Sequence, residues 1–219
     1  MALIDGPRRP AKHGGAPDAL VVLLHGFGSN GDDLIQLAPM LADAAPSAAF
    51  VSPNAPESVP GFPEGRQWFA LTSLDPGLLA AGARKAAPNL DGFLDRELDR
   101  QGVSPARLVL IGFSQGSMMS LQVGLNRAAA PAAIIAFSGG IADADIARKP
   151  AVRPPVLLVH GDQDDRVPPE ASLAAASLLA EGGHGAEIMI CAGLGHSIAP
   201  EGIARASHFL KAALAGRYR

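Results

Sequence analysis

Cysteine is almost absent from this chain of 219 residues, and so is an apolar leader at its start. The single cysteine, Cys191, excludes a disulfide within the chain and is typical of proteins from a reducing compartment. Residues 1–9 lack the apolar stretch of a secretory signal. Together these two absences predict a cytoplasmic protein.

Clusters of basic residues and long apolar runs are missing as well. There is no basic cluster beyond Arg8 and Arg9, and the formal net charge is −3, so we expect no nucleic-acid partner. The longer apolar runs, such as residues 132–137, are far too short to span a bilayer. We therefore expect no stable insertion into a membrane.

The chain does contain enough apolar material for a substantial core. Hydrophobic residues make up 48% of the sequence, which predicts a packed globule and not a disordered chain. A length of 219 residues favours one domain over two. We therefore expect a single α/β domain over residues 1–219.

Short apolar runs alternate with helical patterns along most of the chain. Most of these runs are continuously apolar, as expected of parallel strands that are covered on both faces. The expected strands are residues 20–24, 48–52, 107–111, 133–137, 156–160 and 187–191. This alternation predicts an α/β fold with an open, mostly parallel central sheet and helices on both faces.

Four stretches show the spacing of amphipathic helices. They are residues 34–41, 90–98, 173–179 and 203–214. We expect Asp32 or Asp33 to cap the first helix, and Pro88 to kink or restart the second.

Two regions show neither pattern. Residues Leu3–Ala19 carry prolines and glycines, and we expect them to form an edge hairpin or an ordered arm. Residues Pro53–Asp75 contain the only tryptophan, Trp68, and we expect them to form a long loop. Such a loop in a compact domain is usually functional or disordered.

A serine lies where an expected strand turns into an expected helix. The segment Gly112-Phe113-Ser114-Gln115-Gly116 follows an apolar run and directly precedes a helical pattern. Its glycines permit a tight turn that presents the serine hydroxyl above the sheet, at the positive end of the helix. This nucleophile elbow predicts a serine hydrolase with Ser114 as the nucleophile.

A serine nucleophile needs an imidazole as its base, and elbow proteins carry the serine, the acid and the histidine in that order. His196 follows the last expected strand in a glycine-rich loop, where open α/β sheets place their sites. We favour it over His160, which we expect to shape a turn. His184 is expected in an exposed loop and His208 on the terminal helix, so both are weaker candidates.

The acid is expected in the loop that follows residues 156–160. Asp162, Asp164 and Asp165 crowd this loop, and spacing alone does not choose among them. Asp162 has an alternative role in satisfying backbone N–H groups of the turn, and Asp165 has one in pairing with Arg166 in solvent. The candidates therefore stay open at this point.

Acyl transfer also needs donors for the developing oxyanion. The N–H of Gln115, directly after the serine, supplies one. The glycine-rich loop at residues 25–31 follows an expected strand, and its glycines let the backbone approach a substrate closely. We expect the second donor in this loop.

Together these segments resemble the carboxylesterase/phospholipase family of small α/β-hydrolases, which includes acyl-protein thioesterases. The resemblance covers nearly the whole chain and rests on Leu24–Gly28, Gly112–Gly116, His160–Pro168 and Gly195-His196. It implies the α/β-hydrolase fold. It also selects Asp164, three residues before a Val-Pro pair, as the acid.

The resemblance implies further roles for individual residues. His196 would be the base, and the N–H groups of Phe27 and Gln115 would form the oxyanion hole. The residues implied to line or cover the acyl site are Phe27, Trp68, Leu71 and Leu74, and for Trp68 a place in the core is the alternative.

The sequence thus predicts a serine hydrolase that cleaves carboxylic esters through an acyl-enzyme on Ser114. We expect no metal, no organic cofactor and no separate lid domain. Small-molecule esters with short to medium acyl chains are the first choice, and lysophospholipids or acyl-protein thioesters are the alternative. A non-catalytic binding module is a remote alternative, because such a protein would be expected to lose a triad member. Homo-oligomer formation is left open.

Overall fold

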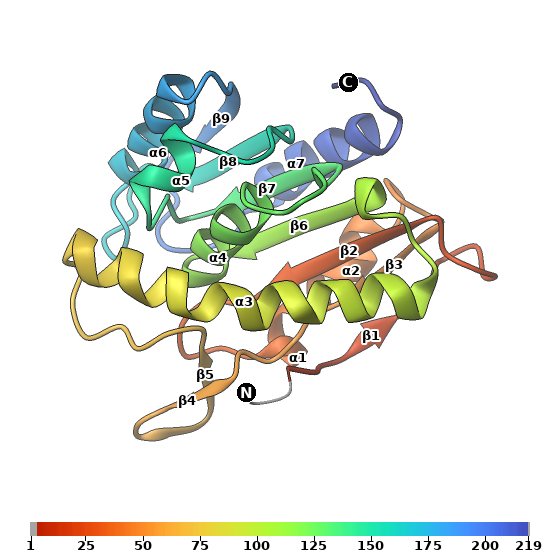
Figure 1. The fold of residues 1–219 in the computed structure, drawn as a ribbon, viewed down its shortest axis with the longest axis horizontal. Coiled ribbons are helices and arrows are strands. Elements are labelled where there is room, and N and C mark those ends of the chain that lie inside the picture. Colours follow the sequence, from red (N-terminus) through yellow and green to blue (C-terminus); the bar gives the residue numbers. More distant parts are fainter. Residues whose placement is uncertain (1–3, 219) are drawn as a thin grey trace.

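A seven-stranded sheet forms the centre of the computed structural model, which describes residues 4–218 (Figure 1). The strands, in their order across the sheet, are β1 (Arg8–Arg9), β3 (Ala48–Val51), β2 (Ala19–Leu24), β6 (Leu108–Phe113), β7 (Ala133–Phe137), β8 (Val156–Gly161) and β9 (Ala186–Cys191). Strand β1 runs antiparallel to β3, and the other neighbours pair in parallel. The expected α/β-hydrolase architecture is confirmed, and each expected strand ends within two residues of its expected bounds.

Alternate side chains of β2 enter two different cores, because successive residues of a strand point to opposite faces. Leu20 and Val22 are buried in one core together with α3 (Pro76–Gln101). Val21 is buried in the other core together with α7 (Pro200–Leu214). Figure 1 shows these two helices on opposite faces of the sheet. Burial on both faces explains why the strand sequences are continuously apolar.

Helix α3 continues through Pro88, so the expected restart at this residue is wrong. A proline inside a helix removes one backbone hydrogen bond and costs about 3 kcal/mol. The inner face of the helix nevertheless carries Ala83, Leu90 and Leu94, each of which is fully buried. Burial of this face offsets the lost bond and keeps the helix continuous.

The helix expected over residues 34–41 is broken into three short pieces. They are α1 (Gly31–Leu34), a 3-10 turn (Ile35–Leu37) and α2 (Ala38–Leu41). Pro39 has no N–H to donate to the preceding turn, so the chain tightens there. The N-cap is Asn30, whose side chain accepts from the N–H of Asp33, and not Asp32 or Asp33.

The two irregular regions hold more structure than the sequence indicates. Strands β4 (Glu57–Val59) and β5 (Phe62–Gln67) form an antiparallel hairpin within the segment expected to be a loop. The expected N-terminal arm contributes only the short edge strand β1, and its first residue, Leu3, lies outside the described residues.

The remaining helices are α4 (Gln115–Gly124), α5 (Ala144–Arg148) and α6 (Glu170–Glu181). A further 3-10 turn spans Pro105–Arg107. Helix α5 has no counterpart among the helices expected from the sequence. Within residues 4–218, no helix has the length and hydropathy that crossing a membrane requires.

Candidate active site

Ser114 lies in a strained turn between β6 and α4. Its backbone has φ 53° and ψ −117°, and non-glycine residues rarely adopt a positive φ. A Cβ at Gly112 would come 2.3 Å from the carbonyl oxygen of Gly116. A Cβ at Gly116 would come 1.9 Å from the carbonyl oxygen of Leu24. Both glycines are therefore required by close backbone packing around the serine.

The turn after β8 supplies a carboxylate that contacts His196. Nδ1 of His196 lies 2.7 Å from Oδ2 of Asp164. Oδ1 of Asp164 accepts the backbone N–H groups of Arg166 at 3.0 Å and of Val167 at 2.9 Å. Burial alone would raise the pKa of Asp164, but the hydrogen bonds from His196 and these two N–H groups outweigh it and lower the pKa. The carboxylate is thus held ionised and fixed in orientation.

The two other aspartates of this turn do not contact His196. Oδ1 of Asp162 accepts the backbone N–H of Gly193 at 2.6 Å, so it joins its turn to the loop after β9. Within residues 4–218 it does not bond an N–H of its own turn, which is the role that the sequence alternative gave it. Asp165 is exposed, and among the described residues it forms no ion pair with Arg166.

His160 braces the same turn from inside the protein. Its ring is buried, with Nδ1 2.7 Å from Oγ of Ser172 and Nε2 2.8 Å from the carbonyl oxygen of Val167. Nε2 also lies 3.2 Å from Oδ2 of Asp164. The structure therefore gives His160 the turn-shaping position expected from the sequence.

The other alternative histidines lie away from Asp164. The sequence expectation for His184 is wrong, because this side chain is only 6% exposed and its Nε2 bonds the carbonyl of Pro154. Its backbone N–H closes the turn after α6 by donating to Leu179, which draws the ring inward. His208 is exposed on α7.

The loop after β2 lies directly against the serine turn. A Cβ at Gly26 would come 3.2 Å from Cβ of Ser114. In residues 4–218, neither the backbone N–H of Phe27 nor that of Gln115 donates to a protein acceptor. Two unpaired donors therefore lie next to the serine, one from each loop.

The side chain of Gln115 ties the segment after β5 to the serine turn. Its Nε2 donates to the carbonyl oxygen of Phe69 at 2.8 Å, and its Oε1 accepts the N–H of Trp68 at 2.9 Å. Gln115 is only 2% exposed, so both bonds are shielded from water. This positioning role has no signal in the sequence motif, because the motif fixes only the serine and the two glycines.

Trp68 does not line the cavity at Ser114, so the expectation that it lines the acyl site is corrected. Its side chain is 1% exposed and packs in the core beneath the loop after β2. The indole Nε1 donates to the carbonyl oxygen of His25 at 2.9 Å. Trp68 supports the loop from within because a buried indole requires a hydrogen-bond acceptor.

A cavity of about 540 Å³ brings the candidate residues together. Its walls include Ser114, His196, Phe27, Leu71, Leu74 and Gln115. Seven further residues line the cavity without having been expected there from the sequence: Gly26, Ser29, Leu34, Phe113, Met118, Arg166 and Val167. Met118 lies one helical turn after Ser114, and this spacing is the signal that identifies it. In the described part of the chain, no hydrogen bond joins the Ser114 hydroxyl to His196.

Known proteins resemble this chain over nearly its full length. A family model described as phospholipase/carboxylesterase matches residues 11–214. The chain is 28% identical to the esterase YpfH of Escherichia coli over 196 residues, which cover 90% of this chain and 81% of that protein. It is 26% identical to acyl-protein thioesterase 1 of Saccharomyces cerevisiae over 210 residues, which cover 89% of this chain and 92% of that protein.

Solved structures show the same fold. Esterase PE8, whose crystal structure is known, is 44% identical in sequence to this chain. The two structures superpose with a TM-score of 0.89, and the match covers 95% of this chain and 98% of that chain. SOBER1 of Arabidopsis thaliana is 24% identical with a TM-score of 0.79, covering 90% of this chain and 99% of that one, and supports the fold alone. The family match over residues 11–214 shows that this chain belongs to the phospholipase/carboxylesterase family of α/β-hydrolases.

Proposed function

We propose that this protein is a serine esterase that hydrolyses small carboxylic esters through an acyl-enzyme on Ser114. The observation that carries the proposal is the convergence of Ser114, His196 and two unpaired backbone N–H groups on one cavity, with Asp164 bonded to the histidine. Four distant segments of the chain supply these groups, and they follow the carboxyl ends of the parallel strands β2, β6, β8 and β9, where open sheets bind their ligands. The esterase names of the relatives support the same activity.

The acylation step follows from the orientation of the imidazole. Because Nδ1 of His196 donates to Asp164, Nε2 is the nitrogen that accepts the proton of Ser114. Oγ then forms a bond to the ester carbonyl carbon. The N–H groups of Phe27 and Gln115 stabilise the oxyanion, and each such donor contributes about 3 kcal/mol to the transition state. The C–O bond to the alcohol breaks, and the alcohol leaves with the proton from His196.

Deacylation repeats these steps with water. His196 takes a proton from water, the resulting oxygen nucleophile attacks the acyl carbon, and the carboxylic acid leaves as Ser114 regains its proton. The Ser114–His196 hydrogen bond forms with bound substrate, since catalytic contacts commonly tighten in the complex. These steps use only groups of the protein chain and water.

Substitution of the serine tests the proposal. Ser114→Ala is expected to abolish p-nitrophenyl butyrate hydrolysis and labelling by a fluorophosphonate, because no other group supplies the nucleophile. Ser177→Ala is a matched control, since Ser177 is exposed on α6 and should keep both properties. An unlabelled Ser114 with full activity would refute the assignment. Absence of turnover on every activated ester would instead favour a non-catalytic binding module.

The acyl chain length separates the first choice from the alternatives. We propose short to medium chains, because the exposed Phe27 and Leu74 leave the cavity mouth open. A smaller apolar cavity of about 190 Å³ adjoins the first and favours longer chains, as in lysophospholipids or acyl-protein thioesters. A rate series from p-nitrophenyl acetate to palmitate decides between them. A maximum at long chains would reverse our order.

We also propose that residues 1–219 act as one catalytic domain in the cytoplasm. The seven-stranded sheet contains both the first strand of the chain, β1, and the last, β9, which supports a single unit. The buried Cys191 is a free thiol, consistent with a reducing compartment. Gel filtration of the purified chain would determine whether it forms a homo-oligomer.

A further inference from the structure

Arg166 lies where two apolar cavities meet. The cavity that contains Ser114 and His196 shares four lining residues with the smaller cavity beside α6, and these are Leu74, Met118, Arg166 and Val167. Arg166 alone among the four is charged. Arg166 is an exposed residue, and it borders both the cavity at the reaction centre and the smaller cavity beside it.

The charge of Arg166 has no partner. As far as residues 4–218 extend, no carboxylate lies within ion-pair distance of it, and neither cavity is lined by Asp or Glu. The nearby Asp164 is only 5% exposed and is engaged by His196 and by two backbone N–H groups. Because Arg166 is exposed, its charge is accessible to an incoming anion, and salt screens the attraction between them.

The backbone of Arg166 is fixed relative to the reaction centre. Its N–H donates to Oδ1 of Asp164 at 3.0 Å, while Oδ2 of the same carboxylate lies 2.7 Å from His196. The side chain of Arg166 thus starts from a point that the proposed catalytic carboxylate holds in place.

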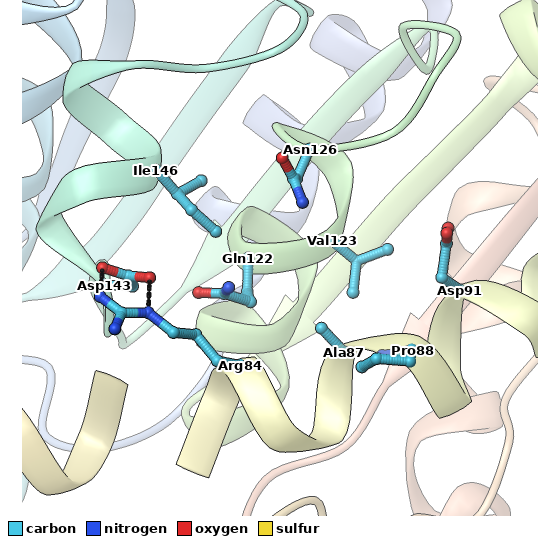
Figure 2. Close-up of a pocket in the computed structure, with 9 residues that line it drawn as sticks. All are labelled: Arg84, Ala87, Pro88, Asp91, Gln122, Val123, Asn126, Asp143 and Ile146. Carbon is cyan, nitrogen blue, oxygen red and sulfur yellow. Dashed lines mark hydrogen bonds and ion pairs between the residues drawn. The ribbon is translucent and has the colours of Figure 1, made fainter. Parts of the chain in front are cut away.

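A third cavity, which shares no lining residue with the cavity at Ser114, shows the contrasting arrangement. This cavity of about 430 Å³ lies between α3, α4 and α5 (Figure 2). The guanidinium of Arg84 forms two bonds to Asp143, and Asp91 is paired with Arg127. Its charges are already satisfied within the protein, so it offers no unpaired charge to a ligand.

We propose that Arg166 binds a negatively charged group carried by the ester substrate, so that the natural substrate is a monoanionic ester. A carboxylate is the simplest such group, because the planar guanidinium forms two parallel hydrogen bonds to it. The charge lies on either the acyl or the alcohol side of the scissile bond. This inference rests on the proposed esterase activity and names its substrate class.

Matched pairs of esters test the inference. The acyl-side pair is p-nitrophenyl hydrogen adipate and p-nitrophenyl hexanoate, which have equal chain lengths and differ in one carboxylate. The alcohol-side pair is 3-carboxy-4-nitrophenyl hexanoate and p-nitrophenyl hexanoate. The measured quantity is the ratio of kcat/KM for the anionic ester to that for the neutral one.

Arg166→Gln is expected to lower this ratio about two- to fivefold for at least one pair, as loss of a solvent-exposed ion pair predicts. The change should fall mainly on KM, because binding of a remote group is equal in ground and transition states. Arg166→Lys should restore part of the ratio. Salt at about 0.5 M should lower the wild-type ratio and leave that of Arg166→Gln unchanged.

Arg96→Gln is the matched control. Arg96 is exposed on α3 and lines neither cavity, so its loss changes the net charge equally and should leave the ratio at the wild-type value. The affected pair identifies the side of the ester that carries the charge.

Two failures are distinguishable. Hydrolysis of the esters with ratios that do not change in Arg166→Gln would overturn this inference alone. Absence of hydrolysis by the wild type, together with an unlabelled Ser114, would overturn the proposed function and this inference with it.

Discussion

The indole of Trp68 and the carbonyl oxygen of His25 are joined by a 2.9 Å hydrogen bond in the core beneath the loop after β2. The ring of His25 bonds two further backbone groups. Its Nδ1 lies 2.8 Å from the carbonyl oxygen of Gly26, and its Nε2 accepts the N–H of Ala55 at 3.0 Å. The acceptor role of Nε2 places the single ring proton on Nδ1. A neutral imidazole and an indole therefore hold the loop that carries the Phe27 N–H.

Trp68→Phe is expected to destabilise the fold by about 1–3 kcal/mol, because the carbonyl of His25 is left unpaired in the core. The loop that carries Phe27 should shift, so kcat for p-nitrophenyl butyrate should fall. Chemical denaturation and steady-state kinetics measure the two effects. Phe93→Leu is the control, since Phe93 is also 1% exposed but contacts only the core. If both variants lose stability but have the same kcat, Trp68 does not position the loop that carries Phe27.

The stability of the protein is expected to fall as pH decreases from 6.5 toward 4. Burial lowers the pKa of His25 from 6.5 to about 4. Between these values the unfolded chain binds the proton and the folded chain does not, so acid favours unfolding by at most about 3 kcal/mol. Burial also lowers the pKa of His184, which acts in the same direction.

Urea titrations at a series of pH values measure this dependence. His25→Gln should flatten the curve between pH 6.5 and 4, because the amide does not titrate in this range. His208→Gln should leave it unchanged, since His208 is exposed on α7. A curve for His25→Gln with the full wild-type slope would contradict a neutral, buried imidazole.

Asp164→Asn is expected to lower kcat about 10⁴-fold with little change in KM, because the amide favours the wrong tautomer of His196. Asp162→Asn and Asp165→Asn change the same charge in the same turn without contact to His196. Both should keep kcat close to the wild-type value. Kinetics on p-nitrophenyl butyrate measure all three, and a low kcat in Asp165→Asn alone would move the acid to that residue.

Two glycine substitutions should have opposite effects on the free energy of unfolding. Gly92→Ala is expected to stabilise the protein by about 0.5–1 kcal/mol, because the added Cβ in α3 would lie 3.5 Å from Nη1 of Arg96, which is an ordinary van der Waals contact. Gly116→Ala should destabilise it by more than that, because its Cβ would overlap the carbonyl of Leu24 at 1.9 Å. Thermal unfolding compares the two. A stable, active Gly116→Ala would show that the serine turn adapts to the added methyl group.

The sheet could be predicted because parallel strands covered on both faces leave an unambiguous signal. Val21 and Leu23 must be apolar for the same reason as Leu20 and Val22, since helices cover each face. The helices were harder to predict. Pro88 by itself predicts a break in α3, because proline removes a backbone hydrogen bond. The helix nevertheless continues, because residues on both sides of Pro88 are buried in the core.

The hairpin of β4 and β5 was also missed. Its strands contain Pro63 and Gly65, which are poor strand formers, so the segment has the composition of a loop. A bridge from Arg66 to Ser29 in the loop after β2 attaches the hairpin to the rest of the protein. Contacts this distant along the chain leave no periodic pattern in the sequence.

The fold class and the turn at Ser114 can be read from the sequence, because strand patterning and glycine spacing constrain the chain locally, and the position of His196 after the last strand makes it the preferred candidate for the base. Three features depend on the folded chain: Trp68 lies in the core, Gln115 bonds a distant segment, and Arg166 borders the cavity without an ion-pair partner among the described residues. These facts depend on side chains brought together from remote positions. Local sequence specifies each backbone turn, but it does not specify which partner a side chain meets after folding.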